Sequence, residues 1–191
     1  FQNSKIPQFL NTLTSINLLR SISDIVPKKN TEFDKIYIRR EDANYRTILN
    51  EADLIEKLKQ NGFKIISTSQ YEILDQINLF LNAKIILSVY GSGLANTVFC
   101  KPGTKIYEIS PNLNSEYDHY LSKRYENLSI LCNLEYHRFF ADSVNVNHHS
   151  KSAKKYISNR VLNESNYYKN LILKLSEVDE IIKIIQQPTE L

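Results

Sequence analysis

The chain has 191 residues, of which 42% are hydrophobic, and this excludes a disordered protein and predicts one α/β-sized domain with a substantial core. Its net charge is only +3, from 24 basic and 21 acidic side chains spread along the sequence, so the composition argues against a nucleic-acid-binding protein. No apolar run approaches the roughly 20 residues that cross a bilayer, and the first residues lack the order of a signal peptide. We therefore expect a soluble protein without a transmembrane segment.

The cysteines and histidines give no metal or disulfide pattern. Cys100 and Cys132 form no CxxC pair, and the His148-His149 pair has no third ligand at a recognisable spacing. We therefore expect a reducing compartment and no metal site. The sequence contains no methionine and begins at Phe1, which suggests that an N-terminal domain of the same protein precedes it.

Residues 1–30 are expected to form a helical segment followed by a linker. Apolar residues recur there at helical spacing, at Phe9, Leu10, Leu13, Ile16 and Leu19. Residues 31–191 are expected to form the main domain, which a C-terminal helix closes over about 166–187. The apolar stripe of that helix is Leu171, Leu175, Val178, Ile182 and Ile185.

Strands and helices alternate through the main domain. Expected strands cover 35–38, 63–66, 83–89, 105–109 and 136–140. Expected helices begin at Asn50, at Ser69, where Ser69 and Glu72 have capping-box spacing, and at Tyr117, and 142–155 is expected to be a loop. Uniformly apolar strands joined by helices are typical of a Rossmann-like parallel sheet with helices on both faces. Ligands of such sheets bind beyond the carboxyl ends of the strands.

The third expected strand runs into a glycine turn, Gly91-Ser92-Gly93-Leu94, which a short helix follows. Glycine takes positive φ and lets a ligand approach the main chain. The N–H groups of the turn and of the helix N-terminus therefore suit a phosphate or carboxylate. The same glycines also fit a plain tight connection between strand and helix, and the local sequence leaves both interpretations open.

Three arginines, Arg39, Arg40 and Arg46, follow the first expected strand. A guanidinium matches phosphate oxygens two at a time, so arginines opposite the glycine turn suit a diphosphate. Alternatively, these arginines pair on the surface with neighbouring carboxylates, which are Glu41, Asp42 and Glu51.

In order and spacing, these motifs resemble the donor-binding domain of glycosyltransferase family 61 from Lys35 to Pro111. The residues that match the family pattern are Arg40, Arg46, Asn50, Glu51, Gly62, Phe63, Gln76, the turn from Tyr90 to Asn96, Glu108 and Pro111. Two positions depart from it, because the family turn begins with His where this chain has Tyr90, and has Ala where this chain has Ser92. A tyrosine, with an ordinary pKa of about 10, cannot serve as a cation or base near neutral pH, but it can stack on a base or hydrogen-bond a phosphate.

The resemblance implies a glycosyltransferase of GT-B architecture, with this chain as its C-terminal half. It implies inverting transfer of a hexose or pentose from a nucleotide-diphosphate donor, UDP-linked, to a glycan acceptor in capsular or cell-surface polysaccharide synthesis. No metal or other cofactor is expected. The enzyme would then be cytoplasmic, either free or peripheral at the inner face of the membrane.

The resemblance also assigns the donor site. The diphosphate would bind Arg40, Arg46, Gly91, Ser92, Gly93 and Leu94. Other donor-site residues would be Asn50, Glu51, Gln76, Tyr90, Asn96 and Glu108. By analogy with GT-B enzymes, Glu108 would accept hydrogen bonds from the ribose hydroxyls, and its alternative role is a core-facing or helix-capping carboxylate.

An inverting transfer needs a base for the proton of the acceptor hydroxyl. The candidates are Glu116, Asp118 and His119, although a polar loop supplies such residues by default. Two other functions stay open. One is a non-catalytic Rossmann-like module that binds nucleotide or serves as a scaffold, and the other is a Rossmann-type enzyme with a dinucleotide or methyl donor, against which the glycine spacing argues.

Overall fold

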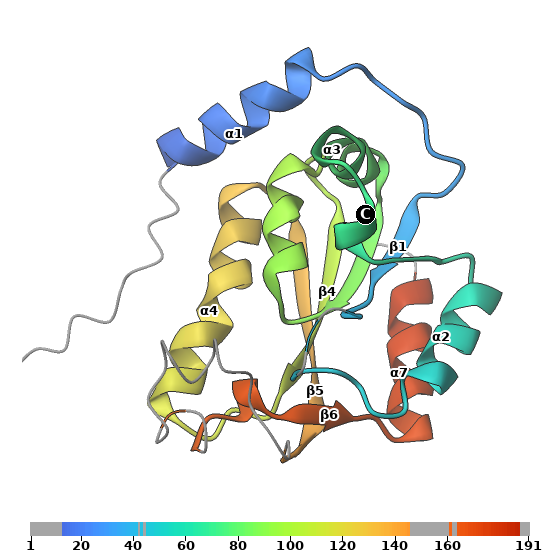
Figure 1. Cartoon of the computed structure of the whole chain (residues 1–191), viewed down its shortest axis with the longest axis vertical. Helices are drawn as coiled ribbons and strands as arrows, with labels where there is room; N and C mark the ends of the chain where they lie inside the picture. Colours follow the sequence, from blue (N-terminus) through green and yellow to red (C-terminus); the bar gives the residue numbers. More distant parts are fainter. Residues whose placement is uncertain (1–12, 42, 44, 146–160, 162–163, 188–191) are drawn as a thin grey trace, which may run out of the picture.

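The computed structural model describes residues 13–41, 43, 45–145, 161 and 164–187. They form a six-stranded sheet between helices, with strand order β2-β1-β3-β4-β5-β6 (Figure 1). The strands are β1 (Lys35–Ile38), β2 (Lys64–Ile66), β3 (Ile85–Val89), β4 (Lys105–Pro111), β5 (Glu135–Val144) and β6 (Asn170–Ile172). Neighbours among the first five strands are parallel, whereas β6 runs antiparallel to β5. The predicted parallel sheet is therefore confirmed for five strands and wrong for the sixth.

Helices cover both faces of the sheet, as predicted. Helices α2 (Glu51–Gln60) and α7 (Leu175–Gln186) contact each other on one face. The other face carries α3 (Ile73–Asn82), the 3₁₀ helix η2 (Ser92–Phe99) and α4 (Glu116–Leu131), and α1 (Leu13–Ile25) packs against η2.

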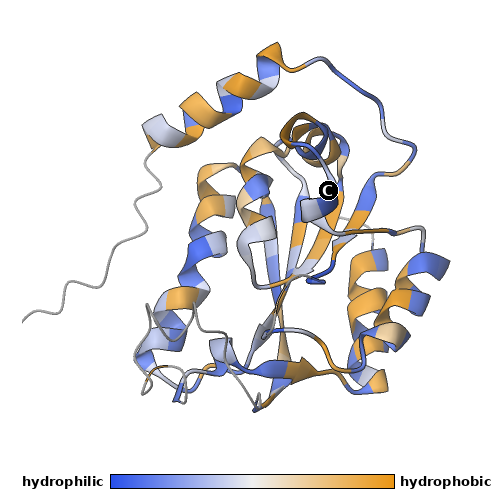
Figure 2. Cartoon of the chain, in the orientation of Figure 1, coloured by the Kyte–Doolittle hydropathy of each residue, from blue (hydrophilic) through white to orange (hydrophobic). Residues whose placement is uncertain are grey.

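Successive strand residues enter two separate cores, because side chains alternate between the faces of a sheet. Ile36, Ile86 and Ile106, aligned across β1, β3 and β4, belong to the core under α3, η2 and α4. Their neighbours along the strands, Tyr37, Leu87 and Tyr107, belong to the core under α2 and α7. Apolar residues are accordingly concentrated along the strands and along α7 (Figure 2).

Helix α2 forms as predicted. Glu51 and Asp53 in its first turn and Lys57 and Lys59 in its last turn complement the helix dipole. Its apolar residues Leu54 and Leu58 are fully buried. The chain leaves the helix through Gly62, whose φ of +79° is in the left-handed region that glycine tolerates.

The predicted capping box at Ser69 is wrong. Ser69 lies in a 3₁₀ turn, η1 (Thr68–Gln70), and its hydroxyl is 3.0 Å from the Ser67 hydroxyl. Helix α3 begins only at Ile73, after Glu72 in extended conformation. The hydroxyl that was expected to cap the helix is therefore engaged in the preceding turn.

The predicted C-terminal helix over 166–187 is also wrong in its first half. That segment forms a 3₁₀ turn, η3 (Asn166–Tyr168), then strand β6, and only then α7. Leu171 is fully buried, and its backbone pairs both with β5 and with the segment around Ile48. These pairings on both edges hold the residue in a strand, although its spacing also suits a helix.

The loop expected from residue 142 begins later than predicted, because β5 continues to Val144 to pair with β6. The rest of that loop to residue 155, including His148 and His149, lies outside the described residues, as do Phe9 and Leu10.

Helix α1 contacts the core through the buried Ile16, whereas Leu13 and Leu19 are exposed. None of the helices in the described ranges is long and apolar enough to span a membrane.

Candidate functional site

The strand order reverses at β1, which lies between β2 on one side and β3 on the other. In open α/β sheets the crevice beyond the carboxyl ends of two such strands is the usual place for a ligand. The hydroxyl of Ser88 in β3 donates to the carbonyl of Ile38 in β1, at 3.2 Å. The segments that follow these two residues, one with the arginines and one with the glycine turn, therefore leave the sheet side by side.

Arg40 lies against the glycine turn. Its Nη1 donates to the carbonyl oxygen of Tyr90 at 3.4 Å. A Cβ built at Gly91 would be only 1.9 Å from that Nη1, and one built at Gly93 would be 3.0 Å from Ile38 Cγ2. Close approach is thus the reason for both glycines, and the expectation of positive φ is wrong, because Gly91 is extended (φ 179°) and Gly93 is not in the left-handed region.

The helix η2 begins directly at this turn. Its first hydrogen bond runs from the Leu94 N–H to the Gly91 carbonyl, at 3.0 Å. The N–H groups of Ser92 and Gly93, which open the helix, have no partner within it. Ser92 is exposed, whereas Leu94 is fully buried and anchors the helix in the core. The turn thereby presents main-chain donors beside the Arg40 guanidinium.

Arg46 reaches the same region from a separate anchor. Its backbone has a φ of +59°, and its N–H donates to the Lys169 carbonyl at 3.0 Å. Its guanidinium carbon lies 4.8 Å from the centre of the Tyr45 ring and 5.2 Å from that of Tyr90. These distances are within the range of cation–π interactions.

Tyr90 is only 2% exposed, and its ring packs against Tyr125 and, edge-on, Tyr167. The hypothesis that it stacks on a nucleotide base therefore finds no exposed ring face. Burial raises the pKa of the Tyr90 hydroxyl well above its ordinary value, so the side chain stays neutral.

Gln76 and Asn96 are brought together, although they are far apart in the sequence. The Asn96 amide donates to Gln76 Oε1 at 2.8 Å, and Gln76 Nε2 donates to the carbonyls of Thr68 and Tyr71, each at 2.9 Å. Both residues therefore fix the glycine-turn helix to the start of α3, and their side-chain amides bond to each other.

The sequence model of the family Glycosyltransferase 61 matches residues 4–107, more than half of the chain. The chain belongs to glycosyltransferase family 61. The match includes Arg40, Arg46, Gln76 and the whole glycine turn. A comparison with curated proteins gives no match. As a member of this family the protein is a glycosyltransferase, an enzyme that transfers a sugar from a donor to an acceptor.

Two residues of this glycosyltransferase that match the family pattern use their side chains for hydrogen bonds within the fold. The Asn50 amide donates to the Leu173 carbonyl at 2.6 Å and accepts from the Leu173 N–H at 3.1 Å, which joins the start of α2 to the end of β6. Glu51 accepts hydrogen bonds from the Tyr37 hydroxyl at 2.7 Å and from Arg39 Nε at 3.1 Å. Arg39 also pairs with Glu41, so the surface-pairing alternative holds for this arginine.

Glu108 lies just past the family match and is fully buried in the middle of β4. It faces Arg138 of β5, whose Nε is 3.5 Å from Glu108 Oε1, and that oxygen also accepts from the Ser110 hydroxyl. Burial raises the pKa of this carboxyl, and the Ser110 hydroxyl and Arg138 offset part of the effect. The strand continues to Pro111, so the structure places Glu108 in the core and not at the rim, where a ribose would lie.

The three candidate bases of the glycosyltransferase occupy the first turn of α4. Asp118 is fully buried and accepts from the N–H groups of Asn114 (3.2 Å) and Asn166 (3.3 Å) and from the Ser165 hydroxyl. It therefore joins α4 to η3 and is closed to an acceptor. Glu116 and His119 are exposed.

Sequence reasoning missed Tyr45 and the residues of β6. Thr47 donates to the Asn170 side chain through both its N–H and its hydroxyl. The Leu49 N–H donates to the carbonyl of Leu171 in β6, and the Leu171 N–H donates to the Thr47 carbonyl. These contacts fix the segment that carries Arg46. Since Thr47 and Asn170 are 123 residues apart, no local pattern could have revealed them.

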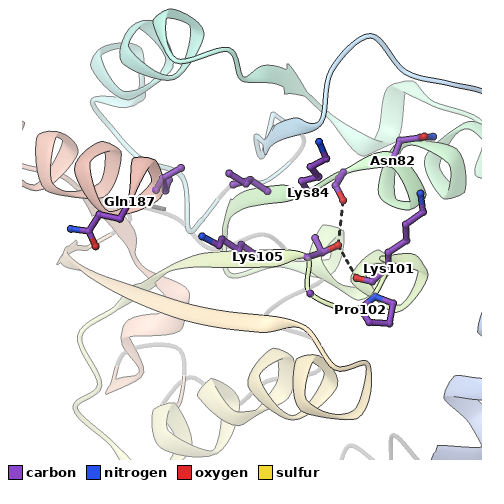
Figure 3. A pocket seen from close by; sticks show the side chains of 11 residues that line it. Asn82, Lys84, Lys101, Pro102, Lys105 and Gln187 are labelled. Atoms are coloured by element: carbon purple, nitrogen blue, oxygen red, sulfur yellow. Dashed lines mark hydrogen bonds between the residues drawn. The ribbon is translucent and has the colours of Figure 1, made fainter. Parts of the chain in front are cut away.

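A cavity of about 470 Å³ lies at the opposite end of the strands, at the amino ends of β3 and β4 (Figure 3). Lys84, Lys101 and Lys105 line it, and Lys84 pairs with Asp34 at 2.9 Å. The Thr104 hydroxyl closes its turn by bonding to the carbonyls of Ala83 and Lys101. The amino ends of the strands are not where α/β enzymes bind their ligands.

Within the ranges that the structure describes, no group of His, Cys, Asp and Glu could hold a metal ion.

Proposed function

We propose that this glycosyltransferase binds a nucleoside-diphosphate sugar at the carboxyl ends of β1 and β3. Arg40, Arg46 and the main-chain N–H groups of Ser92 and Gly93 in the glycine turn would hold the diphosphate. The observation that carries the proposal is the contact of the Arg40 guanidinium with the turn, at the point where the strand order reverses. A guanidinium fork and main-chain donors in one place are the groups that bind phosphate oxygens.

These groups also suit the chemistry of transfer. The acceptor oxygen bonds to the anomeric carbon while the bond from that carbon to the diphosphate oxygen breaks, and the electron pair leaves with the nucleoside diphosphate. Fixed N–H dipoles and guanidinium groups stabilise the charge that develops on this leaving group, which supports a reaction without a metal. The acceptor hydroxyl proton passes to a base, for which Glu116 and His119 remain candidates because they are exposed.

The finer assignment rests on the resemblance to the family. It supports a UDP-linked hexose or pentose as donor, inversion at the anomeric carbon, and a role as the C-terminal half of a GT-B enzyme in capsular or cell-surface polysaccharide synthesis. By the same resemblance the enzyme would work in the cytoplasm or at the inner face of the membrane.

A second candidate function is a nucleotide-binding module without catalysis. It is favoured by the burial of Asp118, whose carboxylate serves α4 and η3. Measurement of sugar release from a bound donor separates the two functions, because a module would bind the nucleotide without turnover.

Isothermal titration of the chain with UDP, GDP, CMP and NAD tests the proposal. We expect saturable binding of one nucleoside diphosphate and weaker binding of CMP, which lacks the second phosphate. The matched control is Lys105→Ala, which removes one positive charge at the amino end of β4, the opposite end from the proposed site. Failure of both diphosphates to bind, or loss of binding in the control, would contradict the proposed site.

A further inference from the structure

We propose that Tyr90 and Tyr45 are positioning residues that hold the Arg46 guanidinium against their aromatic rings and leave its charge available to an anionic ligand. The identity of that ligand as a diphosphate rests on the proposed function. The placement of Arg46 itself rests on geometry alone, with guanidinium-to-ring distances of 4.8 and 5.2 Å.

The two neighbouring arginines are held in contrasting ways. Arg39 is held by the carboxylates of Glu41 and Glu51, which neutralise it. Within the described part of the chain no carboxylate forms an ion pair with Arg46. An aromatic ring attracts a cation through its quadrupole and carries no net charge of its own. Arg46 is therefore fixed in place without losing its charge, as a residue that binds an anion requires.

The Tyr90 ring is itself immobilised. It is buried, with the Tyr167 ring at 4.4 Å in an edge-on arrangement and the Tyr125 ring at 5.2 Å. Such contacts between aromatic rings favour one orientation. Tyr45 covers the guanidinium from a half-buried position and packs on Tyr168, at 5.6 Å between ring centres. A guanidinium in contact with both rings has few alternative positions.

The backbone of Arg46 supports the same conclusion. A φ of +59° is uncommon for a residue with a long side chain, and such conformations persist only where the surroundings enforce them. Here the enforcing contacts are those with β6 and the residue before it, from Arg46 N–H to the Lys169 carbonyl at 3.0 Å and from Leu49 N–H to the Leu171 carbonyl at 2.8 Å. The strained residue is thus the one that carries the guanidinium toward Tyr90.

The first test is the NMR signal of the Arg46 Nε–Hε group in the whole chain, without ligand. In the wild type we expect a ring-current shift from both rings, which Tyr90→Phe retains and Tyr90→Leu reduces, because only the Tyr45 ring then remains. An unshifted wild-type signal, or an equal signal in Tyr90→Leu, would overturn the inference. Since no nucleotide is present, this outcome is independent of the proposed function.

The second test is titration with UDP. Loss of one cation–π contact should weaken binding about 5- to 30-fold in Tyr90→Leu, whereas Tyr90→Phe should stay within about 2-fold of the wild type. In an Arg46→Ala background, Tyr90→Leu should cause no further loss. A full loss in that background would show that Tyr90 acts only on the fold and would overturn the inference.

A core substitution such as Tyr90→Leu can prevent folding. Tyr45→Leu then provides the same test through the half-buried ring, with a similar expected reduction of the ring-current shift and of UDP affinity. If the wild type binds no nucleotide, the proposed function fails, and the NMR signal alone decides the positioning of Arg46.

Discussion

The Arg40 guanidinium lies where a side chain of residue 91 would be, because a methyl group at Gly91 would lie 1.9 Å from Arg40 Nη1. The turn after β3 can therefore receive the arginine that follows β1 only while position 91 has no side chain. This relationship joins two family motifs that are far apart in the sequence, and the Arg40 guanidinium also donates to the carbonyl of Tyr90, 50 residues away.

Gly91→Ala should displace the Arg40 guanidinium and weaken UDP binding about tenfold, roughly the contribution of one charge-assisted hydrogen bond. The fold should tolerate the change, because the backbone at Gly91 is extended and the arginine side chain can move. Titration with UDP, together with thermal unfolding, measures both effects.

Gly103→Ala is the matched control and should show the opposite result. Its φ of +80° is strained for alanine, while no atom lies within 4 Å of the added Cβ. It should lower the free energy of unfolding by about 1 to 2 kcal/mol and leave UDP affinity unchanged. The assignment of Gly91 is wrong if the two variants behave alike.

Arg40→Ala and Arg46→Ala should each weaken UDP binding by about 1.5 to 3 kcal/mol, the range for a hydrogen bond to a charged group. Lys105→Ala removes the same charge at the amino end of β4 and should bind UDP as the wild type does. Isothermal titration of the three variants decides, and wild-type affinity in both arginine variants would contradict the proposed diphosphate site.

Gln76→Ala should destabilise the fold, because it leaves the carbonyls of Thr68 and Tyr71 and the Asn96 amide without their partner. We expect a loss of about 1 to 3 kcal/mol in urea unfolding. Asn96→Ala removes only one of these bonds and should cost less. The two substitutions should couple in a double-mutant cycle, and full additivity would show that the contact between their side chains contributes nothing.

The alternating strands and helices were predictable because each is specified by its own residues. Helix α2 has a regular spacing of Leu54 and Leu58 and a glycine at its end, and it lies where the sequence predicts it. The two segments that contact each other beyond the carboxyl ends of β1 and β3 were predictable as well, since each follows an apolar strand.

The anchors of the site were not predictable, because they depend on distant partners. Leu171 has helical spacing with Leu175 and Val178, yet pairing with β5 and with the segment at Ile48 makes it a strand residue. The sequence predicts a strand that ends at Ile109, just after Glu108. In the structure the pairing of β4 with β5 extends this strand to Pro111, so Glu108 lies in its middle. The contact of Arg46 with Tyr90 likewise requires the fold.

Glu108 should make stability depend on pH. Its buried carboxyl has a pKa raised above the ordinary 4.5, so between these two values the folded chain binds a proton that the unfolded chain has released. The stabilisation is complete below about 4.5 and is lost as the pH rises through the raised pKa. Compared with Glu108→Gln, which does not titrate, the wild type should therefore lose free energy of unfolding as the pH rises.

Urea unfolding of the wild type and Glu108→Gln from pH 4 to 8 measures this difference. Ser110→Ala gives a second check, because the Ser110 hydroxyl donates to the carboxylate and lowers its pKa. Its removal should raise the pKa further and move the loss of stability to higher pH. A difference between wild type and Glu108→Gln that stays constant over this range, or a Ser110→Ala shift toward lower pH, would show that burial does not control the ionisation of Glu108.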